Sequence, residues 1–269
     1  VQTLYAKGLQ GVNAASALSR SPASGLLSYY PFEGNTWDMA RHYQNSSSTH
    51  DDTFTAVGNV SFAPGIVGTA IQLNGGYLIA PNLPVDDLDL PSSFTIEAWI
   101  KPDQINNTFQ RLVLNWGRDE KAYHFGLYRD DVNLYLSADG STQYQVATGG
   151  TVAAGQWQHI AAVSDGTNVI LYLNGEEVAR GSFQGLYQTN NEGLGLGDSA
   201  GSPNQSYRYT GLVDELAFWN VPLSPEQIHE HYLAGAAGYG LTVPEPSSFV
   251  LLLLGALGLA GILWRKGKK

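Results

Sequence analysis

Residues 155–179 read GQWQHIAAVSDGTNVILYLNGEEVA, and this stretch decides the fold class. The segments HIAAVSD and NVILYLNG are short runs with the strand-like alternation of a half-buried β-strand. Asp165-Gly166 and Asn174-Gly175 follow them, and such pairs tolerate the positive φ of a tight hairpin turn. Consecutive hairpins build antiparallel sheet, so we expect an all-β protein.

The same pattern extends from Gly25 to about Ala234, with further turn pairs at Asn74-Gly75 and Asp139-Gly140. The other strand candidates are LLSYYPF, AIQLNGGYLIA, FTIEAWIKP, RLVLNWG, YHFGLYR, VNLYLSA, EEVARGSF and YTGLVDELAFWN. Strands with one apolar face must bury that face against another layer. We therefore expect two antiparallel sheets packed as a sandwich.

One segment, LSPEQIHEHYLAG, departs from the strand pattern. Ser224 is a suitable N-cap, Pro225 suits the first helical position, and Gln227 completes a capping box. Gly235 is a suitable stop. The sequence thus predicts one short helix after the last long strand.

Charge and composition exclude several classes of function. Residues 1–264 hold ten basic and 24 acidic side chains, a net charge of −14, because the last four basic residues stand in the final five positions. Such a surface repels phosphate backbones, so we expect no nucleic-acid partner. The absence of cysteine excludes disulfides, thiolate nucleophiles and cysteine-ligated zinc.

Five blocks in order resemble a known family. They are GLLSYYPFEGNTWDMA, PGIVGTAIQLNGGYLIA, SFTIEAWIKP, the stretch from residue 155 to 179, and GLVDELAFWNVPLSPEQI. Together they resemble the LamG-like jelly roll of the concanavalin A-like lectin/glucanase superfamily over residues 25–235. The resemblance implies an all-β, two-sheet antiparallel jelly-roll sandwich with six or seven strands in each sheet.

The C-terminal segment carries a second resemblance. Val-Pro-Glu-Pro at 243–246 is followed by 16 uncharged residues, 249–264, and then by RKGKK. An apolar run of this length only just approaches the 17 to 25 residues of a membrane-spanning helix. The segment resembles the PEP-CTERM sorting signal of Gram-negative bacteria, with Pro244, Glu245 and Pro246 as its motif and Arg265 and Lys266 in its basic end.

The sorting signal implies a route and a partner. An exosortase-type membrane transpeptidase would read it while the chain is held briefly in the inner membrane, and the protein would then reach the cell surface or extracellular matrix. The basic end also predicts that residues 1–243 lie on the far side of the membrane. Residues 1–24 lack the apolar core of a secretory signal, so we expect an export signal upstream of Val1.

These predictions divide the chain into four parts. Residues 1–24 are expected to form a linker or weak helix, and 25–235 the jelly-roll domain. Residues 236–248 are expected to form a linker that contains Pro-Glu-Pro, and 249–269 an apolar helix with a basic tail, of the transmembrane type.

Calcium is the cofactor that the resemblance implies. Many members of the superfamily hold a structural ion between the opening strand, a turn after the second block and the Asp of the final strand. Asp38, Asn74, Gly75 and Asp214 match these places in the sequence. Hard oxygen ligands from separate loops suit Ca²⁺.

Aromatic residues give candidates for the core and for a ligand rim. The resemblance places Trp99 and Trp157 in the core, and we expect Trp219 there as well. Trp116 stands beside a polar loop, so we predict a ligand rim formed by Trp37, Trp116 and Tyr207. Aromatic rings at such a rim are suited to stacking on sugars.

Catalysis is not expected. The glucanases of the superfamily carry Glu-x-Asp-x-x-Glu on one strand, and this pattern is absent from the sequence. Asp214 and Glu215 are adjacent and should point to opposite faces, and Glu97 is expected to face solvent between inward Ile96 and Ala98. We predict a non-catalytic domain that binds glycan or a surface protein. The alternatives are a structural surface or filament subunit, joined through residues 1–24, and a glycan-processing enzyme.

Overall fold

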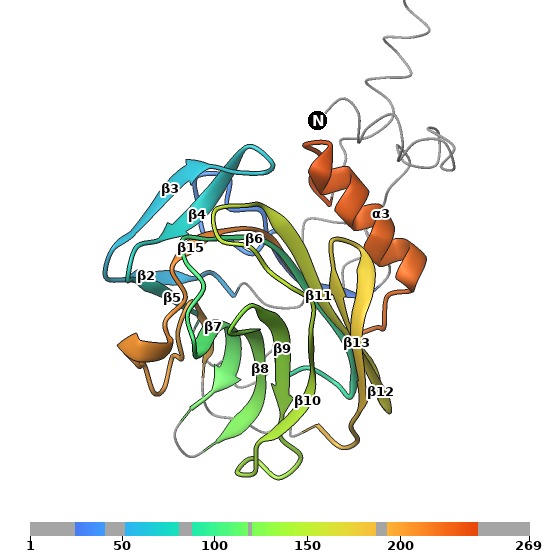
Figure 1. The fold of residues 1–269 in the computed structure, drawn as a ribbon. Helices are drawn as coiled ribbons and strands as arrows, with labels where there is room; N and C mark the ends of the chain where they lie inside the picture. The colour runs from blue at the N-terminus through green and yellow to red at the C-terminus, as the bar shows by residue number, and fades with distance from the viewer. Residues whose placement is uncertain (1–24, 41–51, 81–87, 118–119, 187–192, 242–269) are drawn as a thin grey trace, which may run out of the picture.

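The structure, a computed structural model, describes residues 25–40, 52–80, 88–117, 120–186 and 193–241. Two antiparallel sheets pack face to face, and one α-helix lies outside them (Figure 1). The predicted all-β sandwich is therefore confirmed. The predicted linker of residues 1–24, the sorting residues Pro244, Glu245, Pro246, Arg265 and Lys266, and the predicted apolar helix lie outside the described residues.

The first sheet has eight strands in the order β13-β12-β11-β6-β15-β4-β3, with β1 also paired to β15. The bounds are β1 Leu26–Tyr30, β3 Val60–Pro64, β4 Thr69–Leu73, β6 Ser93–Pro102, β11 Gln158–Asp165, β12 Asn168–Leu173, β13 Glu176–Ser182 and β15 Gly211–Trp219.

The second sheet has seven strands in the order β10-β9-β8-β7-β14-β5-β2. The bounds are β2 Thr55–Val57, β5 Tyr77–Ala80, β7 Phe109–Trp116, β8 Lys121–Tyr128, β9 Asp131–Leu136, β10 Tyr144–Gly149 and β14 Leu194–Leu196. The eight-stranded sheet is thus one strand larger than the resemblance implied, and the seven-stranded sheet agrees with it.

The main core lies between the sheets and follows the two-residue period of the strands. On β6 the alternate residues Phe94, Ile96, Ala98 and Ile100 point inward, and Tyr123, Phe125 and Leu127 of β8 belong to the same cluster. Burying one such large apolar side chain contributes roughly 1.5 to 3 kcal/mol. The prediction that Ile96 and Ala98 face inward is confirmed.

The predicted turn pairs differ in what they connect. Asn174 and Gly175 both have positive φ, 53° and 80°, and join β12 to β13 as a hairpin. Asn74-Gly75 instead carries the chain from β4 in one sheet to β5 in the other. The expected single strand AIQLNGGYLIA is therefore two strands, and β2, β3, β10 and β14 were not predicted from the sequence.

Helix α3 spans Pro225–Ala236 and begins as predicted. Ser224 and Gln227 form a reciprocal capping box, and Pro225 stands at the first position. The predicted stop at Gly235 is wrong, since the helix continues to Ala236. A Cβ at Gly235 would collide with the indole of Trp99, so glycine is needed there for close approach to the sheet.

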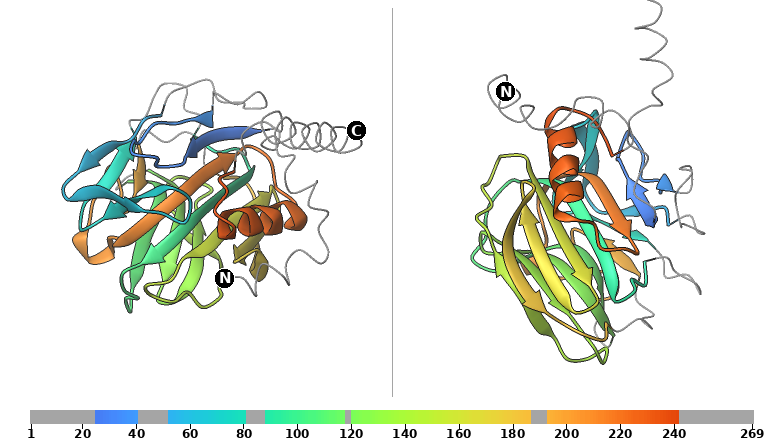
Figure 2. Two further views of the ribbon diagram at one scale, coloured as in Figure 1. Left: turned by 90° about the horizontal axis from the view of Figure 1, so that it is seen from above. Right: turned by 90° about the vertical axis from the view of Figure 1, so that its right-hand side faces the viewer.

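Helix α3 covers the outer face of the eight-stranded sheet, the side turned away from the other sheet (Figure 2). Trp99 points to this face and stacks on Tyr232 of the helix, with 5.7 Å between ring centres. Trp219 belongs to the same layer. Both residues are buried as predicted, but under the helix rather than between the sheets, while Trp157 is only half-buried.

Glu97 corrects the prediction of a solvent-facing side chain. It points outward as the alternation requires, yet it is only 1% exposed because α3 covers it. Its carboxylate lies 2.7 Å from Nδ1 of His231 on α3 and 3.2 Å from Nε2 of His159 on β11. Burial alone would raise the pKa of Glu97, but the two histidines together lower it to about 2.

Packed structure continues for five residues beyond the helix. Gly238 has a φ of 81°, which lets the chain turn back toward the sheet. Leu241 is buried in the layer beneath the helix, and its backbone N–H donates to Glu215 Oε2 at 2.8 Å. Across the described ranges, no helix is long and apolar enough to cross a membrane.

Candidate functional site

The seven-stranded sheet carries a cluster of rings on its outer face. We call Phe109, Trp116, His124, Tyr128, Tyr135 and Tyr207 the aromatic face. Strand pairing places them there, because Phe109 pairs with Tyr128 across β7 and β8 and His124 pairs with Tyr135 across β8 and β9. Their inward neighbours Phe125 and Leu127 lie in the core, so alternation turns these rings outward.

The rings contact one another around Phe109. Its ring centre lies 4.9 Å from Tyr128, 5.6 Å from Tyr135, 5.8 Å from His124 and 5.9 Å from Tyr207. The Tyr135 and Tyr207 contacts are edge-on, at 73° and 86° between ring planes. Phe109, Tyr128, Tyr135 and Tyr207 are each only half-buried. The result is a continuous platform of aromatic surface.

Tyr207 is positioned by a buried carboxylate. It belongs to the short 3-10 helix η2, Gln205–Tyr207, which lies beside β7. Asp198 accepts from Arg111 Nη1 and from Arg208 Nε, each at 2.9 Å, and also from the backbone N–H of Asn204. These bonds fix the η2 loop to the sheet, and the Arg111 guanidinium lies 5.3 Å from the centre of the Tyr207 ring.

Burial holds two titratable groups of the aromatic face, His124 and Tyr135, in their neutral forms. Burial, with a further contribution from Arg111, lowers the pKa of His124 to about 3. Burial and the nearby Tyr128 raise the pKa of Tyr135. The imidazole is therefore neutral, and the phenol keeps its proton as a hydrogen-bond donor.

A buried amide lies among these rings. Asn133 is on β9, two residues before Tyr135, and it pairs with Gly126 of β8, which has no side chain. It is 1% exposed, and neither Nδ2 nor Oδ1 has a hydrogen-bond partner in the described part of the chain. A buried amide without a hydrogen-bond partner lowers the free energy of unfolding by about 1 to 3 kcal/mol. Folding stability therefore does not explain why an amide stands at position 133.

The predicted ligand rim is only partly assembled. Trp116 and Tyr207 both belong to the aromatic face, although Trp116 is only 6% exposed. The centre of its ring lies 6.1 Å from that of His124. Trp37 is 59% exposed and follows β1, in the other sheet. The structure thus brings two of the three residues together. Phe109, Tyr128 and Tyr135 were missed. Alternation within the strand candidates YHFGLYR and VNLYLSA was a usable signal for the two tyrosines, whereas Phe109 lies just before the candidate RLVLNWG.

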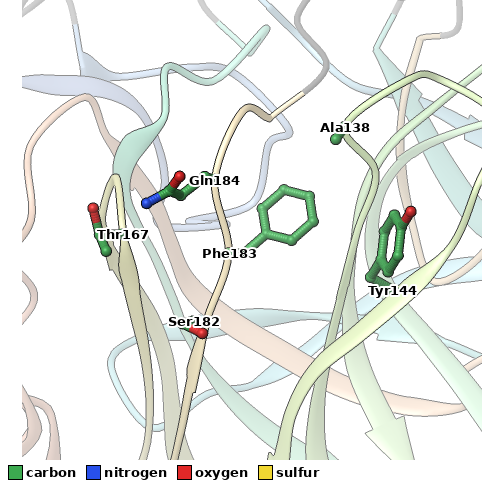
Figure 3. Close-up of a pocket in the computed structure, with 6 residues that line it drawn as sticks. All are labelled: Ala138, Tyr144, Thr167, Ser182, Phe183 and Gln184. Atoms are coloured by element: carbon green, nitrogen blue, oxygen red, sulfur yellow. The ribbon is translucent and has the colours of Figure 1, made fainter.

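A groove lies at one edge of the sandwich, where β10 and β13 meet. Its volume is about 490 Å³, and its lining residues are Ala138, Tyr144, Thr167, Ser182, Phe183 and Gln184. The rings of Tyr144 and Phe183 lie on either side of the opening in Figure 3, with centres 5.9 Å apart.

The residues predicted to bind calcium have other partners. Asp38 Oδ1 accepts from the backbone N–H groups of Tyr29 and Ala40, both at 2.8 Å. The Gly75 carbonyl accepts from Arg208 Nη1 at 2.6 Å, so a cationic group already contacts this oxygen. Asn74, next to Gly75, is exposed.

Asp214, the fourth predicted ligand, is directed at a turn of the first sheet. Its Oδ2 accepts from the backbone N–H groups of Ile66 and Val67 at 3.0 and 3.1 Å. Within the described ranges, no three His, Asp or Glu side chains are grouped as a metal site requires. Three of the four predicted ligands thus already accept hydrogen bonds from protein groups, and calcium binding stays a prediction.

The other buried carboxylates also have structural partners. Glu215 accepts from Tyr29 Oη at 2.7 Å and from the Leu241 backbone. Burial raises its pKa to about 7, and burial together with Glu215 raises the pKa of Asp214 to about 8. Glu215 has a φ of 52° at a bulge of β15, a conformation that bulges impose. None of these carboxylates lies on the aromatic face.

Comparisons with known families agree with this architecture. The model described as the concanavalin A-like lectin/glucanases superfamily matches residues 74–229, more than half of the chain. The model of the PEP-CTERM protein-sorting motif matches residues 242–269.

Two curated relatives match about half of this chain. Pappalysin-1 of Mus musculus is 25% identical over 170 residues, and adhesion G-protein coupled receptor V1 of Danio rerio is 27% identical over 151 residues. The chain spans only 10% and 2% of their lengths. These matches therefore concern one domain of much larger proteins.

Solved structures share the fold at low identity. Domain 4 of AbnA, a GH43 extracellular arabinanase from Geobacillus stearothermophilus, in complex with arabinotriose, has a TM-score of 0.59 at 22% identity. That match covers 77% of this chain and 97% of the domain. The binding domain of botulinum neurotoxin DC in complex with SialylT has a TM-score of 0.59 at 12% identity, covering 79% of this chain and 51% of that one.

Proposed function

Because the chain belongs to the concanavalin A-like lectin/glucanases superfamily and carries a C-terminal PEP-CTERM motif, we propose that it is an exported, non-catalytic protein that binds glycan. The observation that carries this proposal is the aromatic face of the seven-stranded sheet. Four of its six rings stay half-exposed, whereas Trp99 and Trp219 on the outer face of the other sheet are buried beneath α3.

The chemistry of the aromatic face suits a neutral sugar chain. Aromatic rings present a negative face that attracts the C–H groups of a sugar ring, and the Tyr128 and Tyr135 hydroxyls supply donors and acceptors. His124 is uncharged, and the Asp198 carboxylate pairs with both Arg111 and Arg208, which leaves one net positive charge in this cluster. The exposed rings and phenol hydroxyls, rather than a charged pair, would therefore make most of the contacts with a sugar.

The solved structures support the same proposal by analogy alone. One similar domain was solved with arabinotriose and another with SialylT. For delivery, we propose that an exosortase-type transpeptidase processes the chain at the inner membrane of a Gram-negative bacterium and that the domain then acts at the cell surface or in the matrix. A mass measurement of the mature C-terminus tests this route, since an intact Lys269 would contradict processing.

Glycan binding is tested with the purified full chain on a panel of neutral and acidic polysaccharides. We expect retention by at least one neutral polysaccharide, and about tenfold weaker binding for Tyr128→Ala, equivalent to roughly 1.4 kcal/mol. Tyr239→Ala is the matched control, because Tyr239 is an exposed aromatic residue next to α3. Equal losses in both variants, or no retention by any glycan, would contradict the proposal.

Absence of catalysis is part of the proposal. Glycoside hydrolysis needs two carboxyl groups on either side of one bond, and Glu97 and Glu215 are both buried in other hydrogen bonds. We expect no release of reducing sugar from the polysaccharides that bind. Release that disappears in Glu97→Gln or Glu215→Gln would instead favour a glycan-processing enzyme.

A further inference from the structure

The edge groove is a second place where aromatic side chains remain exposed. Tyr144 is the first residue of β10 and is 48% exposed, and Phe183 directly follows β13 and is half-buried. The two rings are tilted by 52° with their centres 5.9 Å apart. Figure 3 shows Tyr144 facing Phe183, with Ala138 above the gap between them.

The position of the groove follows from the packing of the two edge strands. A Cβ at Gly181 would collide with the Val146 carbonyl, and a Cβ at Gly149 would lie 2.7 Å from the Val178 carbonyl. Glycine at both positions lets β10 and β13 approach closely. The larger side chains of Tyr144 and Phe183 stand at one end of these strands, where they line the groove.

The lining of the groove is polar but uncharged. Thr167 and Ser182 supply hydroxyl groups, and Gln184 supplies an amide. None of the six lining residues is an acidic or a basic residue. Rings combined with hydroxyl and amide groups are the same chemistry as on the aromatic face.

The groove and the aromatic face meet at the edge strand β10. Tyr144 and Gln145 are consecutive, so their side chains point to opposite sides of the strand. Gln145 is exposed and pairs with Tyr135 of the aromatic face, whereas Tyr144 lines the groove. From Phe109 on β7 to Gln145 on β10 is three strand spacings, about 14 Å.

We infer that the aromatic face and the edge groove form one extended site for a linear, uncharged oligosaccharide that crosses β10. This inference rests on the proposed glycan binding and adds the class of ligand. A span of about 14 Å plus the groove exceeds a single sugar ring and corresponds to roughly four or more rings in a row. Affinity should therefore rise with chain length.

The test uses isothermal titration of the full chain with linear oligosaccharides of arabinose and, separately, of β-linked glucose, each from two to six units. For the wild type we expect at least a tenfold gain in affinity between two and six units in one series. Phe183→Leu keeps apolar contact with the core but removes the ring. It should abolish most of this gain while leaving the affinity for the two-unit oligosaccharide unchanged. Tyr144→Ala should do the same.

Two controls separate the possible failures. Tyr128→Ala should weaken binding at every length, because it removes part of the aromatic face. A wild type whose affinity does not change with length, or a gain that survives in both groove variants, overturns the extended site but leaves glycan binding intact. A wild type that binds neither series nor any polysaccharide of the panel overturns both proposals.

Discussion

The two outer faces of the sandwich differ in what covers their aromatic residues. On the eight-stranded sheet, Trp99 and Trp219 point outward and lie beneath α3, with Glu97 held between two histidines. On the seven-stranded sheet, Phe109, Tyr128 and Tyr135 also point outward, and the described part of the chain places no α-helix over them (Figure 1). The same alternation thus produces a packing layer on one side and a half-exposed aromatic surface on the other.

Truncating the covered face should have the largest effect on stability. Trp99 packs against Tyr232 and Gly235 of α3, so Trp99→Ala should lower the free energy of unfolding by about 3 to 5 kcal/mol. Chemical denaturation of the full chain measures the change. Trp37→Ala is the control and should change stability by no more than about 0.5 kcal/mol, because Trp37 is exposed. Similar losses in both variants would show that α3 does not bury Trp99.

Acid should weaken the covered face through Glu97. Its pKa in the folded protein is about 2, below its ordinary value of 4.5, so its stabilisation is complete above pH 4.5 and is lost as the pH falls through about 2. The loss should be on the order of 3 kcal/mol. Thermal unfolding of Glu97→Gln should show a flatter acid limb than the wild type, and an unchanged limb would contradict the pairing with His159 and His231.

Asp214 and Glu215 should act in the opposite direction at higher pH. Their pKa values in the folded protein are raised to about 8 and 7, so the folded protein binds more protons and its stability rises as the pH falls from about 8 toward 4. The backbone donors to Asp214 and the Tyr29 hydroxyl beside Glu215 oppose these shifts but do not cancel them. Asp214→Asn should reduce the slope. A melting temperature that decreases as the pH is lowered from about 8 to 4 would contradict the raised pKa values of Asp214 and Glu215.

Removal of calcium should have the smallest effect. Asp38 and Asp214 already accept backbone hydrogen bonds, and Gly75 accepts from Arg208. We therefore expect a chelator to change the melting temperature of the full chain by less than about 1 °C, because removing an ion that the protein does not bind leaves its stability unchanged. A decrease of several degrees, restored by added Ca²⁺, would establish a calcium site.

The sequence predicted individual strands, turns and the helix better than it predicted which strands pair with one another. Hairpins such as Asn174-Gly175 and the capping box of Ser224 and Gln227 depend on neighbouring residues, so pattern alone identified them. The crossing at Asn74-Gly75 depends on which sheet each strand joins, and that is decided by distant contacts. Short strands such as β2 and β14, three residues each, are too brief for a two-residue period to be visible.

The candidate site shows the same limit. Alternation indicated that Glu97 points outward, but only the tertiary position of α3 shows that the outer face above it is covered. Trp116 was chosen because it stands beside a polar loop, and Tyr207 was named with it. The two residues lie on one face because Asp198 fixes the η2 loop to β7. No local pattern connects Phe109 with Tyr207, since their contact joins segments nearly one hundred residues apart.

Glycan should bind to the uncovered face and not to the face beneath α3. Backbone amide chemical-shift mapping by NMR, during titration of the full chain with a retained glycan, distinguishes the two faces. We expect shifts at β7, β8 and β9 around Phe109, Tyr128 and Tyr135, with none at Glu97, His159 or α3. Shifts confined to α3 and the eight-stranded sheet, or to the turn at Trp37, would contradict it.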